Sequence, residues 1–134
     1  DKLWEDETSL DPKKGKKVFD HEKHAVKKLM KIEKKDNTTD VSGVIDVLVA
    51  VDRQFATDAF DEANTPENQA DKKSTKELEK SEKELAKGDE DRDNGKFDKA
   101  INHYKKSWEH AQHAMKEHHN HHHDDDYDSL LILN

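Results

Sequence analysis

The sequence predicts an all-α protein that folds as an up-down-up-down four-helix bundle with extended N- and C-terminal tails. Only 30% of the 134 residues are apolar and 42% are charged, which is too few apolar side chains for the wide core of a sandwich or an α/β sheet. The apolar residues recur at helical spacing in four successive stretches, and the short connections between the stretches favour antiparallel packing of neighbouring helices. The expected organisation is a tail over 1–15, the bundle over 16–119 and a second tail over 120–134.

The first helix is expected over 16–35, after a segment without a regular period. Residues 1–15 carry a few scattered apolar side chains, so we expect an extended tail there. In the helix, one stripe combines apolar residues with two carboxylates at i, i+3 and i+4 spacing. Its members are Val18, Phe19, Glu22, Ala25, Val26, Leu29, Met30 and Glu33. The segment DNTTD at 36–40 has the composition of a turn and ends this helix.

The second helix is expected over 41–64 and is the most apolar of the four, so we expect it at the centre of the bundle. Its predicted buried seam consists of Val44, Ile45, Leu48, Val51, Phe55, Ala59 and Ala63. The β-branched run VIDVLVAV at 44–51 would also suit a strand, but the helical period continues through Phe60 without a turn signal, which favours a helix. Residues 64–71 are expected to form a loop, because Pro66 disfavours helix at the residue before it.

The third and fourth helices are expected over 72–93 and 96–119, with a break at DNG (93–95) between them. Asp71 or Ser74 is expected to cap the third helix. This helix is nearly all charge, yet one heptad-like seam alternates leucines with small residues that permit close approach of a neighbour. The seam consists of Ser74, Leu78, Ser81, Leu85 and Gly88. The predicted core face of the fourth helix consists of Phe97, Ala100, Ile101, Tyr104, Trp108, Ala111 and Met115.

The composition also restricts partners and compartments. Cysteine is absent, which excludes disulfides, thiolate zinc sites, iron–sulfur clusters and thiol catalysis. The longest apolar run, at 47–51, is far shorter than a membrane span. A net charge of −8 with almost no arginine disfavours a nucleic-acid partner. The chain begins at Asp1 without a basic and apolar leader, from which we expect a mature extracellular, periplasmic or cell-surface protein.

Histidine is the most unusual feature of the composition, and nine of the ten histidines are candidate metal ligands. The nine are His21, His24, His110, His113, His118, His119, His121, His122 and His123. Imidazoles one helical turn apart can share an ion, and in an antiparallel bundle the start of the first helix lies beside the end of the last, which gathers all nine at one end. Carboxylates that could complete a coordination shell are Asp20, Glu22, Glu109, Glu117, Asp124, Asp125 and Asp126. Imidazole and carboxylate without thiolate favour Cu(II), Ni(II) or Zn(II).

Two less specific interpretations of the histidines stay open. A helical wheel turns His110 and His113 well away from the core face of their helix, and His21 and His24 likewise, so all four can be ordinary surface residues. The run HHNHHHDDD at 118–126 can be a solvated tail that binds metal weakly, or in part an expression tag.

Two segments resemble known helical modules. The stretch ELAKGDEDRDNGKFDKAINHYKKSWEHA at 84–111 is similar to the turn and second helix of one tetratricopeptide unit, but no further copy is visible, and such arrays need about three units for stability. Together with VDRQFATDAFDEA at 51–63, it resembles small helical-bundle modules of secreted and surface proteins of bacteria and archaea. The resemblance implies no enzymatic activity and suggests an extracellular binding or assembly role.

No motif for enzymatic chemistry accompanies these features. DEDRDNGKFD at 89–98 places its glycine seventh, whereas a calcium-binding EF-hand loop needs it sixth. Glu-x-x-His pairs for a di-iron centre, a haem-attachment motif and a phosphate-binding loop are all missing, so haem and nucleotides are not expected.

The sequence therefore predicts a secreted, non-enzymatic bundle that binds a divalent transition metal at a histidine-rich end. The alternative is a structural subunit of an extracellular filament, surface layer or larger complex. Such a subunit would associate with itself or with a protein partner through residues 1–12 and 127–134, because the apolar run in SLLILN needs a surface to cover it.

Overall fold

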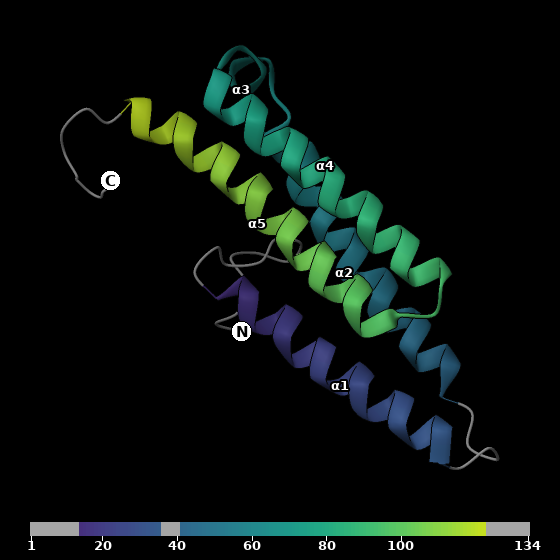
Figure 1. Ribbon diagram of the computed structural model, residues 1–134. Helices are drawn as coiled ribbons and strands as arrows, with labels where there is room; N and C mark the ends of the chain where they lie inside the picture. Colours follow the sequence, from purple (N-terminus) through teal and green to yellow (C-terminus); the bar gives the residue numbers. More distant parts are fainter. Residues whose placement is uncertain (1–13, 36–40, 123–134) are drawn as a thin grey trace.

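In the part of the chain that the structure describes, the protein is all-helical, as the sequence predicts (Figure 1). The computed structural model describes the backbone of residues 14–35 and 41–122, and the side chains of these ranges up to residue 115. They form α1 (Gly15–Lys35), α2 (Ser42–Ala63), α3 (Pro66–Ala70), α4 (Lys72–Asp93) and α5 (Phe97–His122). The long helices match their predicted bounds within one residue, except that α5 extends three residues further. None of the described helices is long and apolar enough to cross a membrane.

The two predicted tails lie mostly outside the described residues. Of the tail expected over 1–15, only Lys14 and Gly15 are described, as a turn residue and the first residue of α1. Of the tail expected over 120–134, residues 120–122 are described, and they continue α5. The predicted docking segments 1–12 and 127–134 and the predicted turn at 36–40 lie outside the described part of the chain.

The loop expected over 64–71 contains the one-turn helix α3. Pro66 ends the helical path of α2, yet it suits the first turn of a new helix, where a backbone N–H has no intrahelical partner. The Thr65 side chain caps this turn by accepting a hydrogen bond from the Asn68 amide at 3.1 Å. Asp71 then caps α4 by accepting from the Ser74 amide at 2.9 Å, as predicted.

The central helix is α5, not the second helix as predicted, because α1, α2 and α4 all pack against α5 (Figure 1). Lys16 pairs with Glu109 at 3.3 Å, and Lys105 donates to Asp20 at 2.9 Å, so α1 and α5 run antiparallel. These contacts place the start of α1 beside the middle of α5. The expectation that it lies beside the end of the last helix is therefore wrong.

The small-residue seam of α4 faces α5 and allows the two helices to approach closely, which is the role that its small residues predict. Ser81 Oγ donates to the Ser107 carbonyl at 2.8 Å. A Cβ atom built on Gly88 would lie 2.5 Å from Tyr104 Cε1, so the buried tyrosine ring occupies the space that any side chain would need. The Tyr104 hydroxyl donates to Asp89 at 2.6 Å, which fixes the ring in this position.

The buried face of α2 is rotated relative to the predicted seam. Val44 and Val51 were expected in the core, but they are 53% and 37% exposed. Ile45, Ala59 and Ala63 are buried as predicted, and Val49, Asp52 and Ala56 are buried in addition. The run at 44–51 is apolar around nearly its whole circumference, so its periodicity could not select the correct face.

We predict opposite effects of alanine at two helical glycines. Gly88→Ala should lower the free energy of unfolding by about 1–3 kcal/mol, because the methyl group overpacks the contact with Tyr104. Gly43→Ala is the matched control, since nothing lies within 4 Å of its Cβ position, and it should raise the free energy by about 0.5–1 kcal/mol through helix propensity. Urea unfolding followed by circular dichroism measures both. Equal stabilisation by the two substitutions would contradict the close contact at Gly88.

Candidate metal centre

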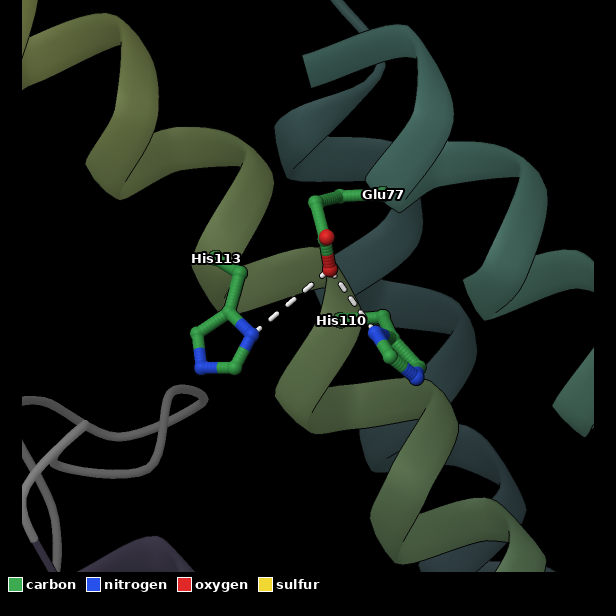
Figure 2. A group of neighbouring side chains, drawn as sticks. All are labelled: Glu77, His110 and His113. Carbon is green, nitrogen blue, oxygen red and sulfur yellow. Dashed lines mark hydrogen bonds and ion pairs between the residues drawn. The ribbon is translucent and has the colours of Figure 1, made fainter. Parts of the chain in front are cut away.

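Three side chains from α4 and α5 converge at the surface of the bundle: Glu77, His110 and His113. Each offers one ligand atom, and these atoms all lie within 4.8 Å of one another. Figure 2 shows Glu77 Oε1 between the two imidazole rings, 2.8 Å from His110 Nδ1 and 3.6 Å from His113 Nδ1. The exposed fraction of the side chain is 19% for Glu77, 26% for His110 and 56% for His113. The group is therefore half-buried and is open to solvent on the side of His113.

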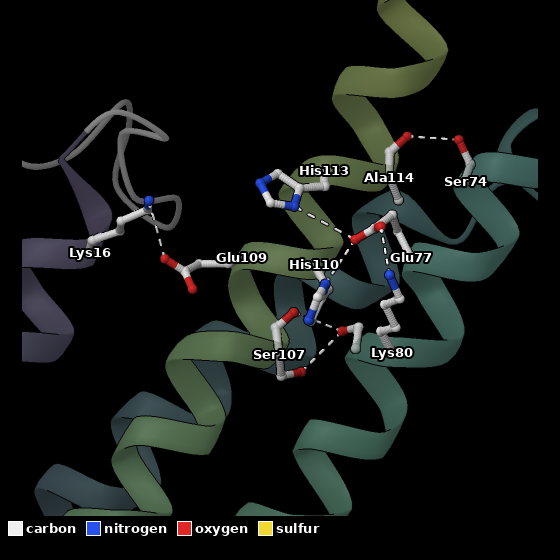
Figure 3. A network of polar contacts seen from close by, with 10 residues as sticks. Lys16, Ser74, Glu77, Lys80, Ser107, Glu109, His110, His113 and Ala114 are labelled. Atoms are coloured by element: carbon white, nitrogen blue, oxygen red, sulfur yellow. Dashed lines mark hydrogen bonds and ion pairs between the residues drawn. The ribbon is translucent and has the colours of Figure 1, made fainter.

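Helix geometry and packing register together create this group. His110 and His113 are one turn apart on α5, so both side chains lie on one face of that helix. Glu77 reaches them because α4 is fixed against α5 one turn before and one turn after it. Ser74 Oγ donates to the Ala114 carbonyl at 2.9 Å on one side (Figure 3), and the Ser81–Ser107 hydrogen bond lies on the other.

The spacing of the three groups suits a divalent transition metal. Zinc–nitrogen and zinc–oxygen bonds of about 2.0–2.2 Å place two ligand atoms of a tetrahedral ion about 3.3–3.5 Å apart. The two distances from Glu77 Oε1, 2.8 and 3.6 Å, lie on either side of this value. An ion would replace the proton with which His110 now donates to Glu77. Two imidazole nitrogens and one carboxylate oxygen are borderline-to-hard ligands that suit Zn(II), Cu(II) or Ni(II) and leave a position for a further ligand.

The electrostatic environment keeps the Glu77 carboxylate ionised. Burial would raise the pKa of Glu77, but the hydrogen bond from His110 and the nearby charges outweigh it and hold this pKa below its usual value. One of these charges is Lys80, whose Nζ lies 3.5 Å from Glu77 Oε2. The lysine side chain is 57% exposed, so solvent screens much of its charge and it can swing away when a cation binds.

His21 and His24 do not belong to this group. Both are exposed on α1, and the Lys16–Glu109 pair shows that α1 contacts a different side of α5 from the side that carries His110 and faces Glu77 of α4 (Figure 3). Among the described side chains, the structure thus brings together His110 and His113 but not the histidines of α1. The remaining predicted ligands are not described: His118, His119, His121 and His122 lie in the last turns of α5 with side chains outside the described set, and His123 lies outside it altogether.

Glu77 is not among the ligands that the sequence predicts, and neither is His103. The structure places His103 between two carboxylates of α4, with Nδ1 2.6 Å from Glu84 and Nε2 3.3 Å from Asp91. Glu77, Glu84 and Asp91 are spaced seven residues apart, in step with the serine and glycine seam of the same helix. That heptad repeat was the available signal, because it lines all three carboxylates up along the α5 contact.

We predict that Glu77→Gln lowers stability in a pH-dependent way. A carboxylate whose folded pKa is depressed contributes stability above its unfolded pKa, and this contribution is lost as pH falls through the folded pKa. The loss should be about 0.5–1.5 kcal/mol at neutral pH, the usual net contribution of a hydrogen bond, and should fall towards zero at acidic pH as Glu77 becomes protonated. Urea unfolding across this pH range measures it, with the exposed Glu79→Gln as control. A pH-independent loss would show that the charge of Glu77 has no role.

Comparison with known proteins assigns no role to these residues. No family model, no curated protein and no solved structure matches the chain. The resemblance of 51–63 and 84–111 to small modules of secreted proteins therefore stays a prediction, and the function is argued from the geometry of the described residues.

Proposed function

We propose that this protein binds a divalent transition metal ion between α4 and α5, through Glu77, His110 and His113. The observation that carries the proposal is the convergence of three ligand atoms from two helices within 4.8 Å, with the carboxylate oxygen between two imidazoles. The ionised state of Glu77 supports it, because the carboxylate offers negative charge to a cation at neutral pH. Zn(II), Cu(II) and Ni(II) are the ions that this ligand set favours.

The site is proposed to serve binding rather than catalysis. One imidazole is largely exposed, so an ion here would exchange with solvent and with ligands supplied from outside the described residues. An extracellular location remains part of the proposal. So does the up-down-up-down topology, which the antiparallel contacts of α5 with α1 and with α4 support. Assembly through residues 1–12 and 127–134 stays a prediction, since those segments are not described.

The first test separates the helical site from the histidine tail. The parent for this test is a variant in which every tail histidine is replaced by Gln: His118, His119, His121, His122 and His123. We expect it to bind one equivalent of Zn(II) in isothermal titration calorimetry and to gain thermal stability by mass action, by about 2.7 kcal/mol at 100 times the dissociation constant. Adding His110→Gln and His113→Gln should abolish both the binding and the stabilisation.

The matched control adds His21→Gln and His24→Gln to the same parent and should leave the ion bound. Failure of the parent to bind Zn(II), Cu(II) or Ni(II) would contradict the proposal. Loss of binding in the α1 control would contradict it too, and would favour the bridge between α1 and the last helix that the sequence predicts.

Metal affinity should also fall as pH falls. Imidazole binds metal only when it is neutral, so each proton that an imidazole must release competes with the ion. Calorimetry of the tail variant at several pH values should show weaker binding at acidic pH. Affinity that is independent of pH would exclude histidine as the ligand.

A further inference from the structure

Two carboxylate side chains meet in the interface between α1 and α2. Asp52 of α2 has no exposed surface, and Glu22 of α1 is half-buried. Both carboxylate oxygens of Asp52 and Oε1 of Glu22 are buried without a hydrogen-bond partner when the two groups are ionised. One turn away, Phe19 of α1 contacts Phe55 of α2, which sets Glu22 and Asp52 at the same level of the interface. Two ionised carboxylates have no proton to donate, so they cannot form a hydrogen bond with each other. A single added proton would allow that bond to form.

Apolar layers enclose the pair on both sides along the helices. Phe19, one turn before Glu22, packs edge-on against Phe55, one turn after Asp52, with ring centroids 6.1 Å apart. In the other direction, Val26 and Val49 have no exposed surface. The pair therefore lies inside the core of the bundle, where an unpaired charge is costly.

The described cations next to the pair in sequence, or joined to its neighbours by hydrogen bonds, have other partners or point elsewhere. Lys23 of α1 and Arg53 of α2 adjoin the pair in sequence, and hydrogen bonds link Asp89 of α4, Tyr104 and Lys105 of α5, and Asp20 of α1. Lys105 donates to Asp20 at 2.9 Å. Asp89 accepts two hydrogen bonds from Arg53 and one from Tyr104. Lys23 follows Glu22 directly in α1, so its side chain points about 100° away around the helix.

Two carboxylates this close in a low-dielectric core cannot both stay ionised at neutral pH. Burial, the hydrogen bond with Glu22 and the negative charge of Glu22 together raise the pKa of Asp52 to about 10. When one oxygen is protonated, its O–H donates to the opposite carboxylate, which satisfies two of the buried oxygens and leaves one negative charge on the pair instead of two.

We propose that Glu22 and Asp52 share one proton at neutral pH, and that release of this proton at alkaline pH detaches α1 from α2. The pair then acts as a proton-dependent latch. Two other kinds of described contact hold α1 on the bundle. Its apolar face packs against the core, including a Phe19–Trp108 ring contact at 5.7 Å, and two partly exposed ion pairs join it to α5. Removing the proton places two negative charges within this apolar face, which opposes its burial.

The first experiment detects the proton itself. Infrared spectra at neutral pH should contain the carbonyl band of a protonated carboxylic acid in the parent and in Asp46→Asn, a control at an exposed position of α2. The band should disappear in Asp52→Asn. Absence of the band from the parent would overturn the proposal.

The second experiment measures the effect on stability. A group whose folded pKa is raised holds its proton in the folded state, so stability is complete below the unfolded pKa and is lost as pH rises towards the folded pKa. The unfolding constant of the parent, divided by that of Asp52→Asn, should rise by up to tenfold per pH unit between about pH 5 and pH 9. A ratio that does not change with pH would overturn the shared proton.

The third experiment tests the release of α1. With Trp4→Phe, Trp108 is the only tryptophan left, and its contact with Phe19 makes its fluorescence report on the docking of α1. At alkaline pH its emission should shift to the red, with little loss of helical circular dichroism. Addition of Asp52→Asn should remove the shift. The same shift in both proteins would show that α1 does not respond to this proton.

Discussion

The close antiparallel contact between α4 and α5 is the constraint on which the rest of the structure depends. With so few large apolar residues, the bundle cannot fill a wide interhelical space, so the two helices approach until the Tyr104 ring of α5 lies against the Gly88 backbone of α4. Gly88 and the serines of the seam permit this approach. The serine hydroxyls donate hydrogen bonds to carbonyls of α5, and these bonds take the place of apolar contacts. Such buried hydrogen bonds also select one register, because a shift along the helix would leave the hydroxyls without partners.

The same register determines the chemistry at the surface of this contact. Carboxylates at 77, 84 and 91 on α4 follow the seven-residue repeat of the seam, and histidines at 103 and 110 on α5 share that spacing. Each of these histidines thus meets a carboxylate, but with different consequences. Both nitrogens of His103 are engaged, by Glu84 and Asp91, which suits a structural ion pair. His110 has His113 beside it on the same carboxylate, which creates a set of converging ligand atoms.

Much of the fold could be predicted from the sequence, because helix bounds depend on local signals. Turn residues, capping side chains and apolar periods located every long helix to within one residue at all but one end. The buried face of α2 could be predicted only in part: Ile45, Ala59 and Ala63 are buried as expected, whereas Val44 and Val51 are exposed although they are as apolar as the buried residues. The histidine pair of α5 was identified by its spacing. Its partner Glu77 was not identified, because the choice of partner depends on which helix packs against which face of α5. The sequence predicted that α1 would lie beside the end of α5, and this prediction was wrong.

The buried carboxyl pair and the proposed metal site place opposite demands on the proton. Metal binding needs neutral imidazoles, so it strengthens as pH rises. The contact between α1 and α2 needs the proton shared by Glu22 and Asp52, so it weakens as pH rises. The metal site lies in the contact between α5 and α4, and the carboxyl pair lies in the contact between α1 and α2. A change at one site therefore does not require a change at the other. Metal binding is thus favoured by less acidic conditions and the contact between α1 and α2 by less alkaline ones, so both requirements are met together only in an intermediate range of pH.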